Sequence, residues 1–181
     1  MSLETLHDVF VEQLKDVYSA ENQILKALPK MAKTASSPEL RQAFEEHLEQ
    51  TKAQVERLDQ VLGIVDETGK GKKCKGMEGL LEEGKETMEQ KREATPAALD
   101  AAMIADAQRV EHYEIAAYGT LCAYAKQLGL RDALELLQET LTEEEQTDER
   151  LTEIANQVNL EAAEAQPEEA SQRSRKTRTA R

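Results

Sequence analysis

The sequence predicts an all-α protein, a four-helix bundle of two helical hairpins joined by a long crossover that contains a short extra helix. Three observations lead to this fold class. The 181 residues include only eight Gly, four Pro and no Trp, and residues that favour helices are abundant. Apolar residues recur at steps of three, four and seven, as on the buried face of an amphipathic helix. Finally, the first hairpin matches the second at a constant offset of 93 positions.

The first hairpin is expected to consist of two long helices, over about residues 3–33 and 38–65. Pro29 lacks a backbone donor, so a kink or local distortion is expected near the end of the first helix. Residues 36–39 read S-S-P-E, with a Ser at the cap, a Pro at the first helical position and an acid in the first turn. This order is typical of a helix start.

A connection rich in Gly and Lys, residues 63–79, follows the first hairpin and leads into a shorter helix over about residues 77–92. The connection is too long for a hairpin turn and can carry the chain along the bundle. The second hairpin is expected to have helices over about residues 95–127 and 131–159, with Gly129 supplying the stop between them.

Acidic residues interrupt the apolar faces of these helices at matching places. Residues 110–121 read V-E-H-Y-E-I-A-A-Y-G-T-L, with Glu114 on the middle of the apolar stripe and Glu111 at its edge. At the constant offset, residues 17–28 read V-Y-S-A-E-N-Q-I-L-K-A-L, with Glu21 in the place of Glu114. A carboxylate in such a position is costly unless it is paired, protonated or bound to a metal.

The offset continues through the second helix of each hairpin, where residues 56–58 and 149–151 both read E-R-L. Amphipathic helices share their periodicity, so a chance match is the alternative. The matched buried acids and the gap-free register favour a true internal repeat. Two such hairpins joined by a crossover are the plan of a ferritin-like bundle, in which dimetal proteins take one Glu and one Glu-x-x-His from each hairpin.

The second hairpin is well supplied with such ligands. Glu144 lies at the centre of the last apolar stripe, Thr147 occupies the position of the expected His, and Asp148 is the substitute. In the first hairpin Thr51 stands opposite Glu144, and His47 is the nearest candidate. The predicted metal ligands are Glu21, Glu114, Glu144, Asp148, Glu111 and His47. Oxygen-rich ligands with an imidazole suit iron or manganese, either as one ion or as a pair.

A buried hydrogen-bonded network without metal is the alternative interpretation of these acids. Tyr18 and Tyr118 each lie near a core Glu and could donate hydrogen bonds to it. A His beside an apolar stripe is also more often a core residue than a ligand. Several inward acids on three helices are hard to neutralise with hydroxyl groups alone, and we therefore favour metal.

Four ungapped blocks of the sequence resemble the ferritin-like DUF892 family, the YciE/YciF stress proteins of bacteria. In order they read V-Y-S-A-E-N-Q, A-F-E-E-H-L-E-Q-T-K-A-Q-V-E-R-L, V-E-H-Y-E-I-A-A-Y-G-T-L and L-L-Q-E-T-L-T-E-E-E-Q-T-D-E-R-L. The resemblance covers about residues 3–160. It implies a ferritin-like bundle, often dimeric, that is related to rubrerythrins and associated with stress responses, but it does not supply a reaction.

Comparison with rubrerythrin-like sites implies carboxylate ligands at four of the predicted positions, namely Glu21, Glu111, Glu114 and Glu144. The carboxylate that such sites take from the second helix does not carry over, because this chain has Gln50 and Gln54 in that neighbourhood.

Two hypotheses for the function follow. The first is a stress-response protein whose core site binds iron or manganese and reacts with oxygen or peroxide, with enzymatic turnover left open. The second is a non-catalytic structural or interaction protein, induced by stress, whose metal site has decayed; the missing Glu-x-x-His and the glutamines support it. Iron storage is a third hypothesis, which requires a large shell of subunits.

Composition excludes several other classes. The net charge of −13 argues against nucleic-acid binding by the folded part, because phosphates would be repelled. No apolar run approaches the roughly 20 residues needed to cross a bilayer, and the N-terminus lacks the apolar core of a signal peptide. Cys74 and Cys122 form no recognisable motif, and Cys74, in the Lys-rich connection, is interpreted as an exposed thiol. A cytoplasmic protein without membrane contact is expected.

The end of the chain differs in composition from the rest. We expect the bundle domain to span residues 1–160 and a disordered basic tail to span residues 161–181. Residues 171–181 hold four Arg and one Lys. Such arms can contact nucleic acid, but more often they are solvated ends.

A second apolar strip on the helix at residues 95–127 consists of Ile104, Ile115 and Cys122. It is expected to contact the crossover helix or another subunit. Because a surplus apolar strip on a highly charged protein is commonly buried in an interface, we expect a two-fold homodimer and no cage.

Overall fold

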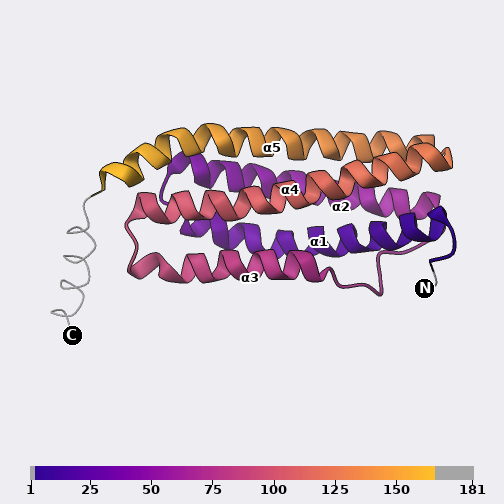
Figure 1. The fold of residues 1–181 in the computed structure, drawn as a ribbon, viewed down its shortest axis with the longest axis horizontal. Helices are drawn as coiled ribbons and strands as arrows, with labels where there is room; N and C mark the ends of the chain where they lie inside the picture. Colours follow the sequence, from indigo (N-terminus) through magenta and orange to yellow (C-terminus); the bar gives the residue numbers. More distant parts are fainter. Residues whose placement is uncertain (1–2, 166–181) are drawn as a thin grey trace.

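The structure, a computed structural model, describes residues 3–165, and these fold into four long helices and one short one (Figure 1). A single 3-10 turn, η1, follows the short helix. In chain order the elements are α1 (Leu6–Thr34), α2 (Pro38–Ile64), α3 (Lys75–Glu89), η1 (Gln90–Arg92), α4 (Pro96–Leu128) and α5 (Arg131–Glu164). The predicted all-α fold class is confirmed.

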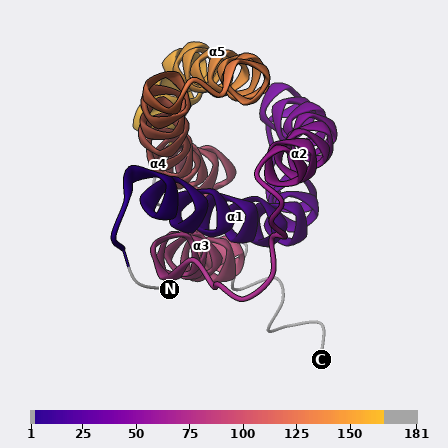
Figure 2. The ribbon, with the colours of Figure 1, turned by 90° about the vertical axis from the view of Figure 1, so that its right-hand side faces the viewer.

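The long helices form two hairpins, α1 with α2 and α4 with α5, as the internal repeat predicts. Viewed end on, the four long helices surround a common axis, and α3 lies outside them against α1 and α4 (Figure 2). The crossover between the hairpins therefore adds a fifth helix to one side of the bundle. Within residues 3–165, no such helix lies on the opposite side, between α2 and α5.

Several helix ends carry the signals that the sequence indicates. Ser37 and Thr95 accept hydrogen bonds from backbone N–H groups at the starts of α2 and α4, and each is followed by a Pro in the first turn. Gly129 ends α4 with φ of 72°, a left-handed conformation that suits Gly because it lacks a Cβ. These helix ends thus follow from local chemistry.

Other helix ends differ from expectation. Thr5 and Asp8 form a capping box, which sets the start of α1 at Leu6. The same helix passes through Pro29 and ends at Thr34. At the other end of the chain, α5 extends beyond residue 159 to Glu164. The predicted basic tail falls mostly on residues 166–181, which lie outside the described part of the chain.

A buried carboxylate on α4 closes the turn between α1 and α2. Asp100 is 2% exposed and accepts hydrogen bonds from the backbone N–H groups of Ser36, at 2.9 Å, and Ser37, at 2.7 Å. These two donors precede α2 and have no partner within the helix, so Asp100 satisfies them from the second hairpin.

The crossover packs closely on the bundle where it passes α1. A Cβ at Gly69 would overlap the ring of Tyr18, so only Gly fits at this position. Cys74, at the end of the connection, caps α3, and its Sγ lies 2.9 Å from Tyr113 Oη, which donates to Asp16 Oδ2 at 2.8 Å.

The prediction that Cys74 is an exposed thiol is wrong. The residue is 1% exposed, because the last residue of the Lys-rich connection turns inward to start α3. Burial, together with the nearby Asp16 carboxylate, raises the pKa of its thiol. This thiol is therefore protonated and shielded.

The core has two apolar clusters, one toward each end of the bundle. One contains Leu28, Phe44 and Met103, and the other contains Phe10 and Leu121. Between them on each long helix lie buried polar residues. The bundle thus has a polar layer across its middle.

The second apolar strip on α4 is largely covered within the chain. Ile104 is buried in the same cluster as Met77 of α3, and Cys122 is buried in the other cluster, whereas Ile115 is half-buried. Two of the three strip residues are thus buried within the chain, and the expected contact with the crossover helix or another subunit stays a prediction. Among residues 3–165, no helix combines the length and the apolar character that a membrane span requires.

Candidate metal centre

The polar layer contains five of the six predicted metal ligands, and every long helix contributes to it. All five are at most 3% exposed: Glu21 from α1, His47 from α2, Glu111 and Glu114 from α4, and Glu144 from α5. Each lies on the inward face of its helix because the apolar periodicity continues before and after it.

Four of these residues form a compact group, which we call the core cluster: His47, Glu111, Glu114 and Glu144. Each offers one ligand atom, and these atoms all lie within 4.8 Å of one another. His47 Nε2 is 3.5 Å from Glu111 Oε1. One imidazole and three carboxylates are a ligand set suited to iron or manganese.

Most polar atoms of the core cluster have no hydrogen-bond partner within the described residues. Both carboxylate oxygens of Glu114 and of Glu144, one oxygen of Glu111 and both ring nitrogens of His47 are buried and unpaired. Leaving a buried polar atom unpaired costs about 1–3 kcal/mol, so native proteins rarely do it. One cation among these atoms would satisfy several of them, and the donor set therefore fits a metal ion.

Glu21 lies beside the core cluster and has a protein partner. Tyr118 Oη donates a hydrogen bond to Glu21 Oε1, whereas Oε2 has no partner in the part of the chain that the structure covers. The expected hydrogen bond from Tyr118 is therefore present, but Tyr18 packs beneath Gly69 instead. One oxygen of Glu21 is held by a hydroxyl group and the other remains free to bind a cation.

Burial raises the pKa of all four carboxyl groups. For Glu21 the pKa rises to about 7, although the hydrogen bond from Tyr118 opposes the shift. For Glu114 and Glu144 the pKa rises well above the usual range, first through burial and then through the charge of Glu21. Burial also raises the pKa of Glu111, against the opposing effect of His47. Without a cation these groups favour the neutral form, and a bound cation would reverse that preference.

Asp148, the sixth predicted ligand, lies outside the core cluster. Its Oδ2 is 3.5 Å from His112 Nε2, and Gln108 Nε2 donates to its Oδ1 at 3.2 Å. The side chain is 22% exposed, at the surface between α4 and α5. Asp148 therefore does not take the place of the missing His of the Glu-x-x-His pattern.

On α2, the residues around His47 are polar but mostly engaged. Thr51 Oγ1 donates to the backbone oxygen of His47 at 2.8 Å. Gln54 is fully buried, and its Nε2 donates to Glu143 Oε2 at 3.1 Å, while its Oε1 has no partner among the described residues. Gln54 thus offers one neutral oxygen to the polar layer.

Sequence reasoning missed the ion pair between Arg57 and Glu143 beside this layer. The Arg57 guanidinium donates to both oxygens of Glu143, at 2.8 and 2.6 Å. Such a pair fixes the position of Glu143, which in turn accepts from Gln54. The E-R-L block shared by both hairpins singles out Arg57, but spacing alone could not identify Glu143 on α5 as the partner of Arg57.

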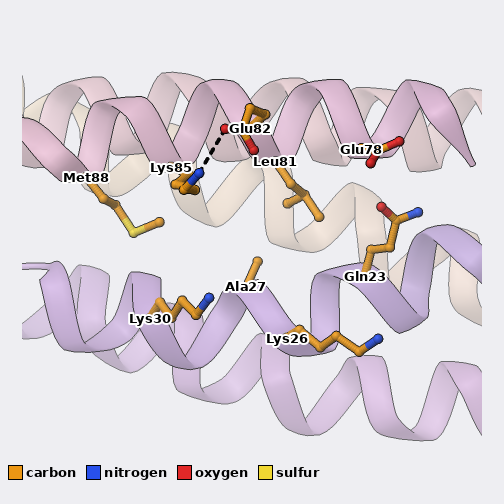
Figure 3. Close-up of a pocket in the computed structure, with 9 residues that line it drawn as sticks. All are labelled: Gln23, Lys26, Ala27, Lys30, Glu78, Leu81, Glu82, Lys85 and Met88. Atoms are coloured by element: carbon orange, nitrogen blue, oxygen red, sulfur yellow. Dashed lines mark hydrogen bonds and ion pairs between the residues drawn. The ribbon is translucent and has the colours of Figure 1, made fainter.

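A separate groove runs along the surface between α1 and α3, on the side that the crossover covers (Figure 3). It has a volume of about 270 Å³, and Ala27, Leu81 and Met88 form its apolar part. Lys26 and Lys30 line its edge, and Lys85 is paired with Glu82. None of its lining residues belongs to the polar layer.

The comparison with known sequences gives one family and one close relative. A profile described as a domain of unknown function, DUF892, matches residues 5–164. The chain is 51% identical to protein YciF of Escherichia coli (strain K12) over 166 residues, which cover 90% of this chain and 98% of that protein.

Solved structures show the same architecture. The crystal structure of the E. coli stress protein YciF matches with a TM-score of 0.82 at 49% identity, over 86% of this chain and 97% of that one. YcfI from Rhodopseudomonas palustris matches with a TM-score of 0.79 at 43% identity, over 83% and 95%. A protein from Xanthomonas campestris pv. campestris, at 19% identity and a TM-score of 0.69, covers 86% and 94% and shares the fold.

Proposed function

Because the chain belongs to the DUF892 family of YciF-like proteins, and because its polar layer holds unpaired buried ligands, we propose that it is a metal-binding stress-response protein. The core cluster would hold iron or manganese, as one ion or a pair, and the bound metal would supply reactivity toward a small oxidant such as oxygen or peroxide. The observation that carries this proposal is the core cluster, in which the buried atoms of His47, Glu114 and Glu144 have no partner in the described chain.

The residues of the polar layer divide into two roles under this proposal. The core cluster would hold the ion, with Glu21 and Gln54 Oε1 available at its edge for a second one. A bound ion would supply electron exchange with the oxidant. Tyr118 would orient the Glu21 carboxyl group through its hydrogen bond, and the apolar clusters on either side would keep the surrounding core dry.

Metal analysis of the purified protein tests this proposal. We expect about one or two equivalents of iron or manganese per chain after purification without chelator or after anaerobic reconstitution. This is the amount that the ligands of the core cluster could bind. Less than about a tenth of an equivalent under both conditions would contradict it.

A non-catalytic interaction protein with a decayed metal site is the second candidate. The observation that favours it is the replacement of the Glu-x-x-His ligands by Thr51, Gln54 and Thr147, together with the hydroxyl donor on Glu21. Under this alternative the polar layer is a set of protonated acids, and metal does not change the thermal stability of the protein.

We also propose a cytoplasmic location, for which the two free cysteines, Cys74 and Cys122, are the support. A reducing compartment keeps such thiols free.

A further inference from the structure

The sides of the bundle differ in what covers them. Helices within each hairpin pack along their length, and α3 covers the side formed by α1 and α4 (Figure 2). No further described element lies over the side formed by α2 and α5. A molecule that reaches the core cluster would therefore pass most directly between these two helices.

A pocket of about 170 Å³ lies on that side. Its lining residues come only from the two helices: Ala43, Glu46 and Gln50 from α2, and Gln146, Thr147 and Arg150 from α5. Ala43 and Gln50 lie one turn before and one turn after His47, and Thr147 lies one turn after Glu144. The pocket is thus placed over the two ligands that α2 and α5 contribute to the core cluster.

The pocket has one anionic and one cationic side chain, Glu46 and Arg150. Glu46 keeps its charge while it accepts a hydrogen bond from Gln42 at 2.6 Å, so Arg150 is the group that could attract an anion. The guanidinium of Arg150 has no carboxylate within 4 Å among residues 3–165. Gln50 and Gln146 add amide donors beside it. A guanidinium with neighbouring amide groups is the usual arrangement for binding small oxyanions and other monovalent anions.

We propose that this pocket is the mouth of the metal centre and that it admits small monovalent anions, which Arg150 attracts and which then reach the core cluster past His47. The inference rests on the proposed metal centre. It goes beyond that proposal because it assigns an access route and a charge preference to the metal centre. It also gives roles to Gln50 and Arg150, which are not ligands of the core cluster.

Azide binding to the iron-loaded protein tests the route, with the azide-dependent absorption band of the metal as the readout. Arg150→Gln is expected to weaken azide binding by about two- to fivefold, as for the loss of one partly screened charge. Gln50→Trp, which places a bulky ring in the mouth, is expected to slow both azide association and removal of the metal by a chelator several-fold. Arg131→Gln, at the start of the same helix, is the matched control and is expected to behave as the wild type.

The outcomes separate this inference from the proposed function. If the wild type loads iron and both pocket variants bind azide and release metal as the wild type does, the route is wrong and the metal centre stands. If the variants load iron equally and only Arg150→Gln and Gln50→Trp are impaired, the route is supported. If the wild type loads no iron, the proposed function fails and the route fails with it.

Discussion

Glu114 is the residue at which the two candidate functions differ most clearly. Both its oxygens are buried and unpaired in the described chain, and its pKa is raised well above the usual range by burial and by the charge of Glu21. In the metal-free protein its neutral form is therefore favoured, and a Gln in its place has nearly the same shape and charge as that form.

We expect Glu114→Gln to leave the Tm of the metal-free protein unchanged or raised, and to abolish the gain in stability on adding metal. That gain should be about 3 kcal/mol for the wild type at a hundredfold excess of metal over its Kd. Thermal unfolding with and without metal measures both effects, and Glu145→Gln, an exposed neighbour on α5, is the control. A variant that retains the full gain would exclude Glu114 as a ligand.

The raised pKa values also make the stability of the metal-free protein depend on pH. Unfolded, these carboxyl groups lose their protons near the ordinary value of 4.5, whereas folded Glu21 keeps its proton up to about pH 7, and the raised pKa values of Glu114 and Glu144 act in the same direction. The stabilisation is therefore complete below about pH 4.5 and is lost as the pH rises through these folded values.

Between about pH 5 and pH 7 we expect the free energy of unfolding to fall by roughly 1 kcal/mol per pH unit for each proton retained. Urea denaturation in the presence of a chelator measures this slope. A stability that increases over this range would show that the buried acids are ionised and paired in the folded protein.

At the scale of one element, α3 depends on Cys74 for its attachment. Sγ accepts from the backbone N–H of Met77 at 3.4 Å and contacts the hydroxyl group of Tyr113 on α4. One side chain thus caps the helix and anchors the crossover.

Cys74→Ala is expected to lower the free energy of unfolding by about 1 kcal/mol, the usual cost of losing a helix cap. Cys74→Ser keeps an acceptor at the cap and should recover most of that loss. Chemical denaturation of the two variants measures the difference, and equal stabilities would mean that the cap contributes nothing.

Helix periodicity predicted the four long helices and the polar layer because inward positions repeat along a helix whatever it packs against. It predicted Asp148 as a ligand beside Glu144, since residues four apart differ by only a small rotation, but the position of α4 determines which of the two is covered. The burial of Cys74 depends on Tyr113 and Asp16, far away in sequence, so the local Lys-rich composition was misleading.

At the scale of the whole molecule, we still expect a two-fold dimer, but the surface expected to form it changes. Ile104 is 2% exposed within the single chain, whereas Leu160 on α5 is 62% exposed. Beside it, a groove of about 550 Å³ is lined by Pro38, Ile154 and Val158 among others. Charged residues such as Glu153 and Glu161 also line this groove, and we propose this end of α5 as the surface for a second copy.

Light scattering should therefore give a mass of two chains, each of 20.3 kDa. Leu160→Glu is expected to shift the population toward the single chain, because it places a charge in the apolar contact. A mass of one chain for the wild type would contradict the dimer, and one above about ten chains would indicate a closed shell such as iron storage requires.

The carboxylate of Asp100 bears on how the two hairpins, α1–α2 and α4–α5, could have arisen from one repeated unit. It holds the α1–α2 turn from the second half, but its counterpart in the repeat, His7, is exposed on α1. The α4–α5 turn closes through Gly129 without help. Two copies of the first half would leave both Ser-Ser turns without an acceptor, and two copies of the second half would bury a carboxylate with no turn to bind. The halves therefore share an ancestral pattern but are no longer interchangeable modules, and a tandem duplicate of either one should fold poorly.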